Sequence, residues 1–235
     1  MDPTGHINND PSELDAANAA IDILTEHGIT VEVDWGWVDG IWNPGSWTIS
    51  ELAKVVAGVE DLAAKIGAEL NNGLSNAENF RNVVGPVTMR RVRKCRDDAA
   101  ALTLLNTITL YDGAFYYDTG GATSPEWSKE CVVHELGHAW DWNAGKMPSM
   151  FIAWETGAWQ RPTEYAEANF SEHWADTVAV WVYPNAADAG RSLGPRHKEY
   201  ITNVVTASPD WWFPLYLAPA AWAGSFVMDR MCLWE

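Results

Sequence analysis

Basic residues are scarce in this chain, and long apolar runs are missing. The 235 residues include 15 lysines and arginines against 32 aspartates and glutamates, for a formal net charge of −17. Such an acidic surface repels nucleic-acid phosphates and anionic lipids, so nucleic acid is not an expected partner. No apolar run approaches the ~20 residues that a membrane span needs, so no membrane-spanning helix is expected.

Cysteine is also rare, and its spacing matches no metal-binding pattern. Cys95, Cys131 and Cys232 are an odd set that allows one disulfide at most, and we favour unbridged cysteines. The start of the chain lacks the basic segment and apolar core of a signal peptide. These features leave the compartment open, with a secreted, extracellular protein as the favoured hypothesis.

Internal repeats and clear linkers are absent from the sequence, and its composition is that of a globular protein, with 47% hydrophobic and 20% charged residues. Apolar periodicity predicts both helices and strands. The predicted helices cover residues 15–27, about 52–66, 125–144, from 163 or 169 to 183, and from 195. The predicted strands cover 29–35, 83–92 and 104–111. The sequence therefore predicts an α+β fold with a small mixed sheet.

The dipeptide Asp112-Gly113 separates the predicted strand 104–111 from a second β-like run over 114–118. Asp-Gly between two such runs is typical of a β-hairpin. We therefore expect an antiparallel edge strand directly before the helix 125–144.

Two further clusters allow more than one interpretation. Trp211-Trp212-Phe213, part of a total of 15 tryptophans, fits either core packing, which we favour, or a ligand platform. The locally basic cluster within residues 90–96 fits the solvated side of a strand and its exit, which we favour, or a contact with an acidic substrate or partner.

Two histidines four residues apart are the feature around which the chain is organised. On a helix, His134 and His138 lie on the same face and can direct two ring nitrogens at one point, which is half of a tetrahedral zinc site. Glu135 lies about 100° around the helix and can serve as the base for a metal-bound water. His-Glu-x-x-His also occurs by chance, so the motif needs further support.

A third metal ligand is expected from a later helix. Glu172 and Asp176 are four residues apart and share a helix face. One carboxylate can bind the metal while the other accepts the free ring N–H of a ligand histidine, which fixes its tautomer. We assign Glu172 as the ligand and Asp176 as the acceptor from His134. His173 points about 100° away and is expected to be a neighbour.

These two motifs resemble those of the zincin metallopeptidases, in the glutamate-ligand branch known as gluzincins. The histidine helix matches the family's His-Glu-x-x-His helix, and residues 172–176 match its Glu-x-x-x-Asp helix. Asp141 and Ala144 stand where the metzincins carry glycine and histidine. Within the branch, the sequence is most similar to the family of the anthrax lethal factor catalytic domain. There too a tyrosine stands seven residues before the glutamate ligand, as Tyr165 does before Glu172. The resemblance covers about residues 104–205.

The resemblance implies one zincin-like domain over residues 1–235, with an N-terminal lobe of about 13–145 and a mainly helical C-terminal lobe of about 146–235. It also implies a zinc-dependent endopeptidase whose protein or peptide substrate pairs with the edge strand. Glu135 would take a proton from the zinc-activated water, and Tyr165 would stabilise the oxyanion. His197 is a further candidate for the oxyanion or the substrate, although a surface histidine is the interpretation we favour.

A binding or adhesion module is the competing hypothesis. Such a protein would keep the zincin fold and use a Trp-rich surface to hold glycans or another protein. The presence of Glu135 favours the peptidase, because a purely structural zinc site needs no base.

Overall fold

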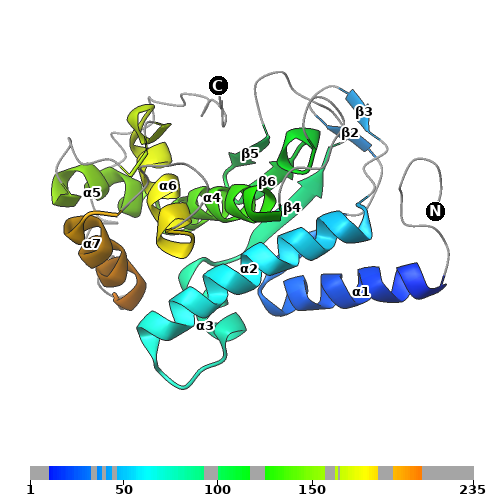
Figure 1. The fold of residues 1–235 in the computed structure, drawn as a ribbon, viewed down its shortest axis with the longest axis horizontal. Coiled ribbons are helices and arrows are strands. Elements are labelled where there is room, and N and C mark those ends of the chain that lie inside the picture. The colour runs from blue at the N-terminus through cyan, green and yellow to red at the C-terminus, as the bar shows by residue number, and fades with distance from the viewer. Residues whose placement is uncertain are drawn as a thin grey trace.

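The computed structural model describes residues 11–32, 36–38, 41–43, 47–92, 100–116, 125–156, 162–163, 165–184 and 193–207. These ranges form an α+β fold in which helices outnumber strands around a small mixed sheet (Figure 1). The coarse fold class predicted from the sequence is therefore confirmed. None of the helices in these ranges is long and apolar enough to cross a bilayer.

A four-stranded sheet carries an antiparallel strand at one edge. In spatial order the strands are β1 (Ile29–Val31), β4 (Val87–Arg91), β6 (Thr107–Leu110) and β5 (Ala101–Leu104). The first three run parallel, and β5 runs antiparallel to β6. A separate two-stranded sheet pairs β2 (Gly36–Val38) with β3 (Ile41–Asn43). The sheet therefore has an antiparallel edge strand, but this strand is β5 and not the run 114–118 predicted from the sequence.

The hairpin that forms this edge lies elsewhere than predicted. Leu105 and Asn106 make its turn, with Leu105 at φ 61°, so the edge strand precedes the central strand β6. Asp112-Gly113 instead begins the short 3-10 helix η1 (Asp112–Ala114). The Asp112 carboxylate is bound by Arg91, and its carbonyl accepts the N–H of Phe115 at 2.9 Å. These contacts hold the dipeptide in a helical turn, and β6 pairs with β4 and β5 instead of with the residues that follow Gly113, so the hairpin prediction at this position is wrong.

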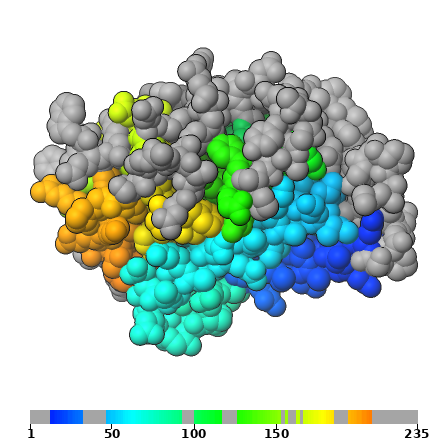
Figure 2. All heavy atoms as spheres, in the orientation of Figure 1, coloured from blue at the N-terminus to red at the C-terminus, as the bar shows by residue number. Residues whose placement is uncertain are grey.

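Helices make up the remainder of the described fold. In chain order they are α1 (Pro11–Glu26), α2 (Ile49–Leu70), α3 (Asn76–Val83), α4 (Pro125–Asn143), α5 (Met147–Thr156), the 3-10 helix η2 (Tyr165–Glu167), α6 (Phe170–Val182) and α7 (Pro195–Thr206). Helices α5, α6 and α7 gather at the left of Figure 1, and α1 lies at the opposite end beneath α2. The space-filling view shows α1, α2 and α3 forming the lower part of this face (Figure 2).

Two of these helices were not predicted. The helix α5 falls in a stretch interpreted as a connection, and α3 covers residues for which no element was predicted, ending at Val83, the first residue of the predicted strand 83–92. Ser75 caps α3 by accepting the N–H of Glu78 at 3.2 Å. Gly85 then turns the chain with φ 82°, so the strand begins only at Val87.

Helix α4, which carries the two motif histidines, lies at the centre of the fold between α2 and α6 and against β5 and β6. Two glycines allow this packing. A Cβ on Gly58 of α2 would lie 3.2 Å from the carbonyl oxygen of Lys129, and a Cβ on Gly137 would lie 2.9 Å from Cα of Ala175 on α6. Any side chain at position 137 would therefore push α6 away from α4. Trp174 of α6 closes the contact by donating its indole N–H to the Gly137 carbonyl at 3.0 Å.

A buried ion pair joins the sheet to α2. Arg91 of β4 donates to Glu51 at 3.1 Å, and the two side chains are 0% and 1% exposed. Glu51 also completes the cap of α2, because its carboxylate accepts the Thr48 N–H at 2.9 Å. Arg91 is thus an internal cation, and its prediction as part of a solvated basic face is wrong. Its neighbour Arg90 is partly exposed, at 31%, and is paired with Glu32.

Several sequence features fall outside the described residues. Trp211-Trp212-Phe213, Cys95 and Cys232 are among them. Cys131 is buried on α4, at 4% exposure, within the main hydrophobic core.

Replacing Arg91 with Met should lower the free energy of unfolding by about 3–5 kcal/mol, because it leaves the Glu51 carboxylate buried without its cation. The matched change Arg90→Met should cost less than about 1 kcal/mol, since that pair is 31% and 45% exposed. Urea denaturation of both variants measures the difference. Equal costs would contradict a structural role for the buried pair.

Candidate metal centre

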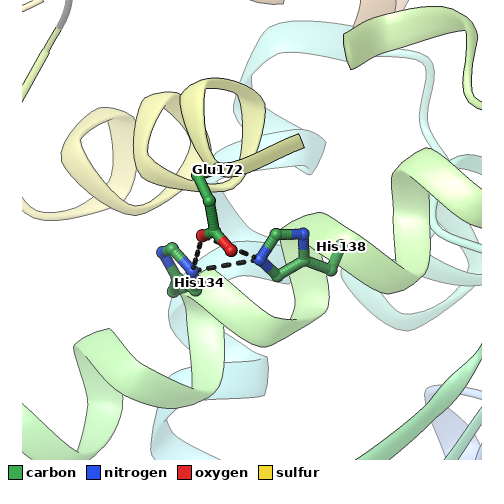
Figure 3. A group of neighbouring side chains, drawn as sticks. All are labelled: His134, His138 and Glu172. Atoms are coloured by element: carbon green, nitrogen blue, oxygen red, sulfur yellow. Dashed lines mark hydrogen bonds and ion pairs between the residues drawn. The ribbon is translucent and has the colours of Figure 1, made fainter. Parts of the chain in front are cut away.

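Three buried side chains from two helices converge on one point. His134 and His138 project from α4 and Glu172 projects from α6, and the three point toward one another (Figure 3). His134 Nε2 and His138 Nε2 lie 3.0 and 3.1 Å from Glu172 Oε2, and the two ring nitrogens lie 3.1 Å apart. The side chains that the sequence proposed as ligands are therefore brought together.

The chemistry of these three donors fits a metal ion. In a tetrahedral zinc site with bonds near 2.0–2.1 Å, two ligand atoms lie about 3.3 Å apart, close to the spacing seen here. All three residues are at most 6% exposed, so little water reaches them. Two imidazole nitrogens and a carboxylate oxygen facing one another in a dry site form a set of lone pairs that a cation would satisfy. Among the described residues, this is the group that could hold a metal ion.

The three groups also alter one another's protonation. Burial by itself lowers the pKa of His138, but the facing Glu172 carboxylate outweighs burial and raises that pKa above the ordinary 6.5. Burial by itself raises the pKa of Glu172, but His138 and His134 hold it well below its ordinary 4.5. Glu172 is therefore ionised at neutral pH, and its charge favours a proton on His138 that competes with an incoming metal ion.

The outer nitrogen of His134 is held by a carboxylate. His134 Nδ1 lies 2.9 Å from Asp176 Oδ1, the contact expected for a histidine that directs its Nε2 at a metal. The Thr163 hydroxyl donates to the other oxygen of Asp176 and accepts the N–H of Ala166 at 3.0 Å. Thr163 therefore links Asp176, which holds His134, to η2, the turn that includes Tyr165.

The outer nitrogen of His138 has a different partner. His138 Nδ1 lies 3.1 Å from Ser171 Oγ, and Lys146 Nζ donates to the same oxygen at 3.2 Å. A serine hydroxyl has two lone pairs, so it can accept from both. Lys146 also lies 3.3 Å from the buried carboxylate of Asp141, and its backbone has φ 64°, a left-handed conformation that lysine rarely adopts. The turn after α4 is thus fixed against the back of His138.

The remaining motif residue, Glu135, is 2% exposed and contacts the edge strand. The hydroxyl of Thr103 on β5 donates to Glu135 Oε2 at 2.5 Å. The glutamate that follows the first ligand histidine is therefore held by a side chain from the strand at the edge of the sheet.

The two other proposed site residues are placed differently. His197 is only 1% exposed, so the interpretation as a surface histidine is wrong. Its Nε2 lies 2.9 Å from Nε2 of His173, which pairs the two histidines with each other. Burial lowers the pKa of His197. The backbone of Tyr165 lies in η2, and its side chain falls outside the described part of the structure.

Four contacts around the ligands had not been predicted from the sequence: those of Thr103, Lys146, Thr163 and Ser171. The contact of Ser171 could have been predicted, because Ser171 directly precedes the ligand Glu172 at the start of a predicted helix. The other three come from segments outside the two motif helices, and no local pattern marks them.

Comparisons of the chain with protein-family models, with curated proteins and with solved structures found no match. The residues of the site and their geometry are therefore what indicates a function for this chain.

Metal affinity should weaken as the pH falls, and the weakening should begin above pH 6.5. The reason is that His138 has a raised pKa in the metal-free protein, so its proton is bound below that raised pKa and released above it. Competition with a chelator, using Co²⁺ or Zn²⁺ between about pH 8 and pH 5, measures the effect. An affinity that does not change over this range would contradict the assignment of His138 as a ligand.

Proposed function

We propose that the protein is a zinc-dependent endopeptidase. The observation that carries the proposal is the buried triangle of His134, His138 and Glu172, with Glu135 adjacent to it on the same helix turn. A donor set of two imidazoles and one carboxylate suits zinc. Three protein ligands also leave a fourth position open, which is the arrangement of catalytic zinc sites rather than structural ones.

Zinc bound by these residues would supply a Lewis acid that lowers the pKa of a water from ~15.7 toward ~7. The protein's own contribution begins with Glu135, which would accept a proton from that water and deliver it to the leaving amine. Asp176 and Ser171 would keep the two histidines oriented with Nε2 toward the ion.

The edge strand supports a peptide as the substrate. β5 is paired with β6 on one side, and its own residue Thr103 contacts Glu135, so the strand lies beside the proposed base. An extended peptide added antiparallel to such an edge would pass close to Glu135. Tyr165 is proposed to stabilise the oxyanion on the strength of the family resemblance alone. We leave His197 out of the chemistry, because its Nε2 is engaged by His173.

Glu135→Gln should bind zinc as the wild type does and lose most of its activity. The amide keeps the size of the carboxylate but cannot accept the proton, so kcat/KM should fall by about 10²–10⁴-fold. The measurement is cleavage of a quenched fluorogenic peptide library and of denatured casein by zinc-loaded protein. Glu126→Gln, at an exposed position on the same helix, is the matched control and should retain activity.

The outcomes separate the competing hypotheses. Bound zinc without cleavage of any substrate by the wild type would favour the binding module. A protein that takes up no zinc would refute both the peptidase and the ligand assignment.

A further inference from the structure

A threonine on the edge strand holds the proposed catalytic base. Thr103 is the third residue of the four-residue strand β5, opposite Ile108 of β6. Its hydroxyl donates to Glu135 Oε2 at 2.5 Å and lies 3.3 Å from the main-chain carbonyl of the same residue. The two groups are 32 residues apart in the sequence and meet only because α4 packs against β5.

The hydrogen bond from Thr103 to Glu135 is short and charge-assisted, and such bonds are strong. A hydroxyl that donates to a carboxylate makes a charge-assisted bond of about 2.5–2.7 Å, roughly twice as strong as a neutral one. Glu135 is almost fully buried, so solvent does not compete for that oxygen. A glutamate side chain has several rotatable bonds, and fixing one of its two oxygens restricts the position of the other.

We propose that Thr103 is a positioning residue for proton transfer. By fixing Oε2, its hydroxyl directs Oε1 of Glu135 toward the reacting water. The inference rests on the proposed function, because it assumes that Glu135 is the base. Catalysis depends steeply on such placement, and a displacement of about 1 Å can cost about 100-fold in rate.

The same strand would then serve two purposes. Its outer edge is proposed to pair with the peptide, and its Thr103 side chain fixes the base. The position of the substrate and the position of the base would therefore be set by one element, and a shift of β5 would move both together.

The first test uses the zinc-loaded full chain with the library peptide that the wild type cleaves best. Thr103→Val removes the hydroxyl and keeps the shape, so kcat should fall about 10- to 100-fold with KM and zinc affinity unchanged. Thr103→Ser restores the hydroxyl and should restore kcat. Thr109→Val makes the same chemical change on the neighbouring strand β6 and should leave kcat as it is. An unchanged kcat in Thr103→Val, or equal losses in the two valine variants, would overturn the proposal.

The second test does not depend on activity. Crystal structures of the metal-free wild type and of Thr103→Val should show the Glu135 carboxylate in one position in the wild type and spread over several in the variant. A carboxylate that keeps its position without the hydroxyl would overturn the positioning role even if the wild type cleaves no peptide. A wild type that cleaves nothing while Thr103 still fixes Glu135 would refute the proposed function and leave the positioning of Glu135 established.

Discussion

The close approach of α4 and α6 is the constraint on which the rest of the site depends. Gly137, the residue before the second ligand histidine, leaves room for Ala175, where even a methyl group would meet the Ala175 backbone at 2.9 Å. Because the two helices pack this tightly, Glu172 reaches the two histidines across the gap. The pattern His-Glu-Leu-Gly-His thus supplies two ligands, His134 and His138, and through its glycine it leaves the space that lets Glu172 of α6 supply the third.

Burial of the three ligands favours the binding of a cation between them. A carboxylate and two imidazoles that are at most 6% exposed carry a large desolvation cost, which a cation between them would offset. The groups behind the ligands differ in charge: the carboxylate of Asp176 supports His134, whereas a serine hydroxyl held by Lys146 supports His138. A carboxylate partner makes an imidazole more basic, so the two histidines would contribute unequally to a bound ion.

The parts of the site that lie on one helix could be predicted from sequence, because helical periodicity fixes which residues share a face. This held for His134 with His138 and for Glu172 with Asp176. The contact of Thr103 with Glu135 depends on how the sheet packs against α4. The spacing of residues along the chain does not predict such a contact. The misplaced hairpin has a similar cause, since a buried Arg91 binds Asp112 and overrides the local preference of Asp-Gly.

X-ray absorption at the zinc edge tests the central claim most directly. Protein loaded with one equivalent of zinc should show nitrogen and oxygen neighbours at about 2.0–2.1 Å, with the scattering signature of two imidazoles. Replacing His138 with alanine should remove one of them. Failure to bind zinc, or a sulfur neighbour at about 2.3 Å from a cysteine such as Cys131, would contradict the assignment of His134, His138 and Glu172 as the metal ligands.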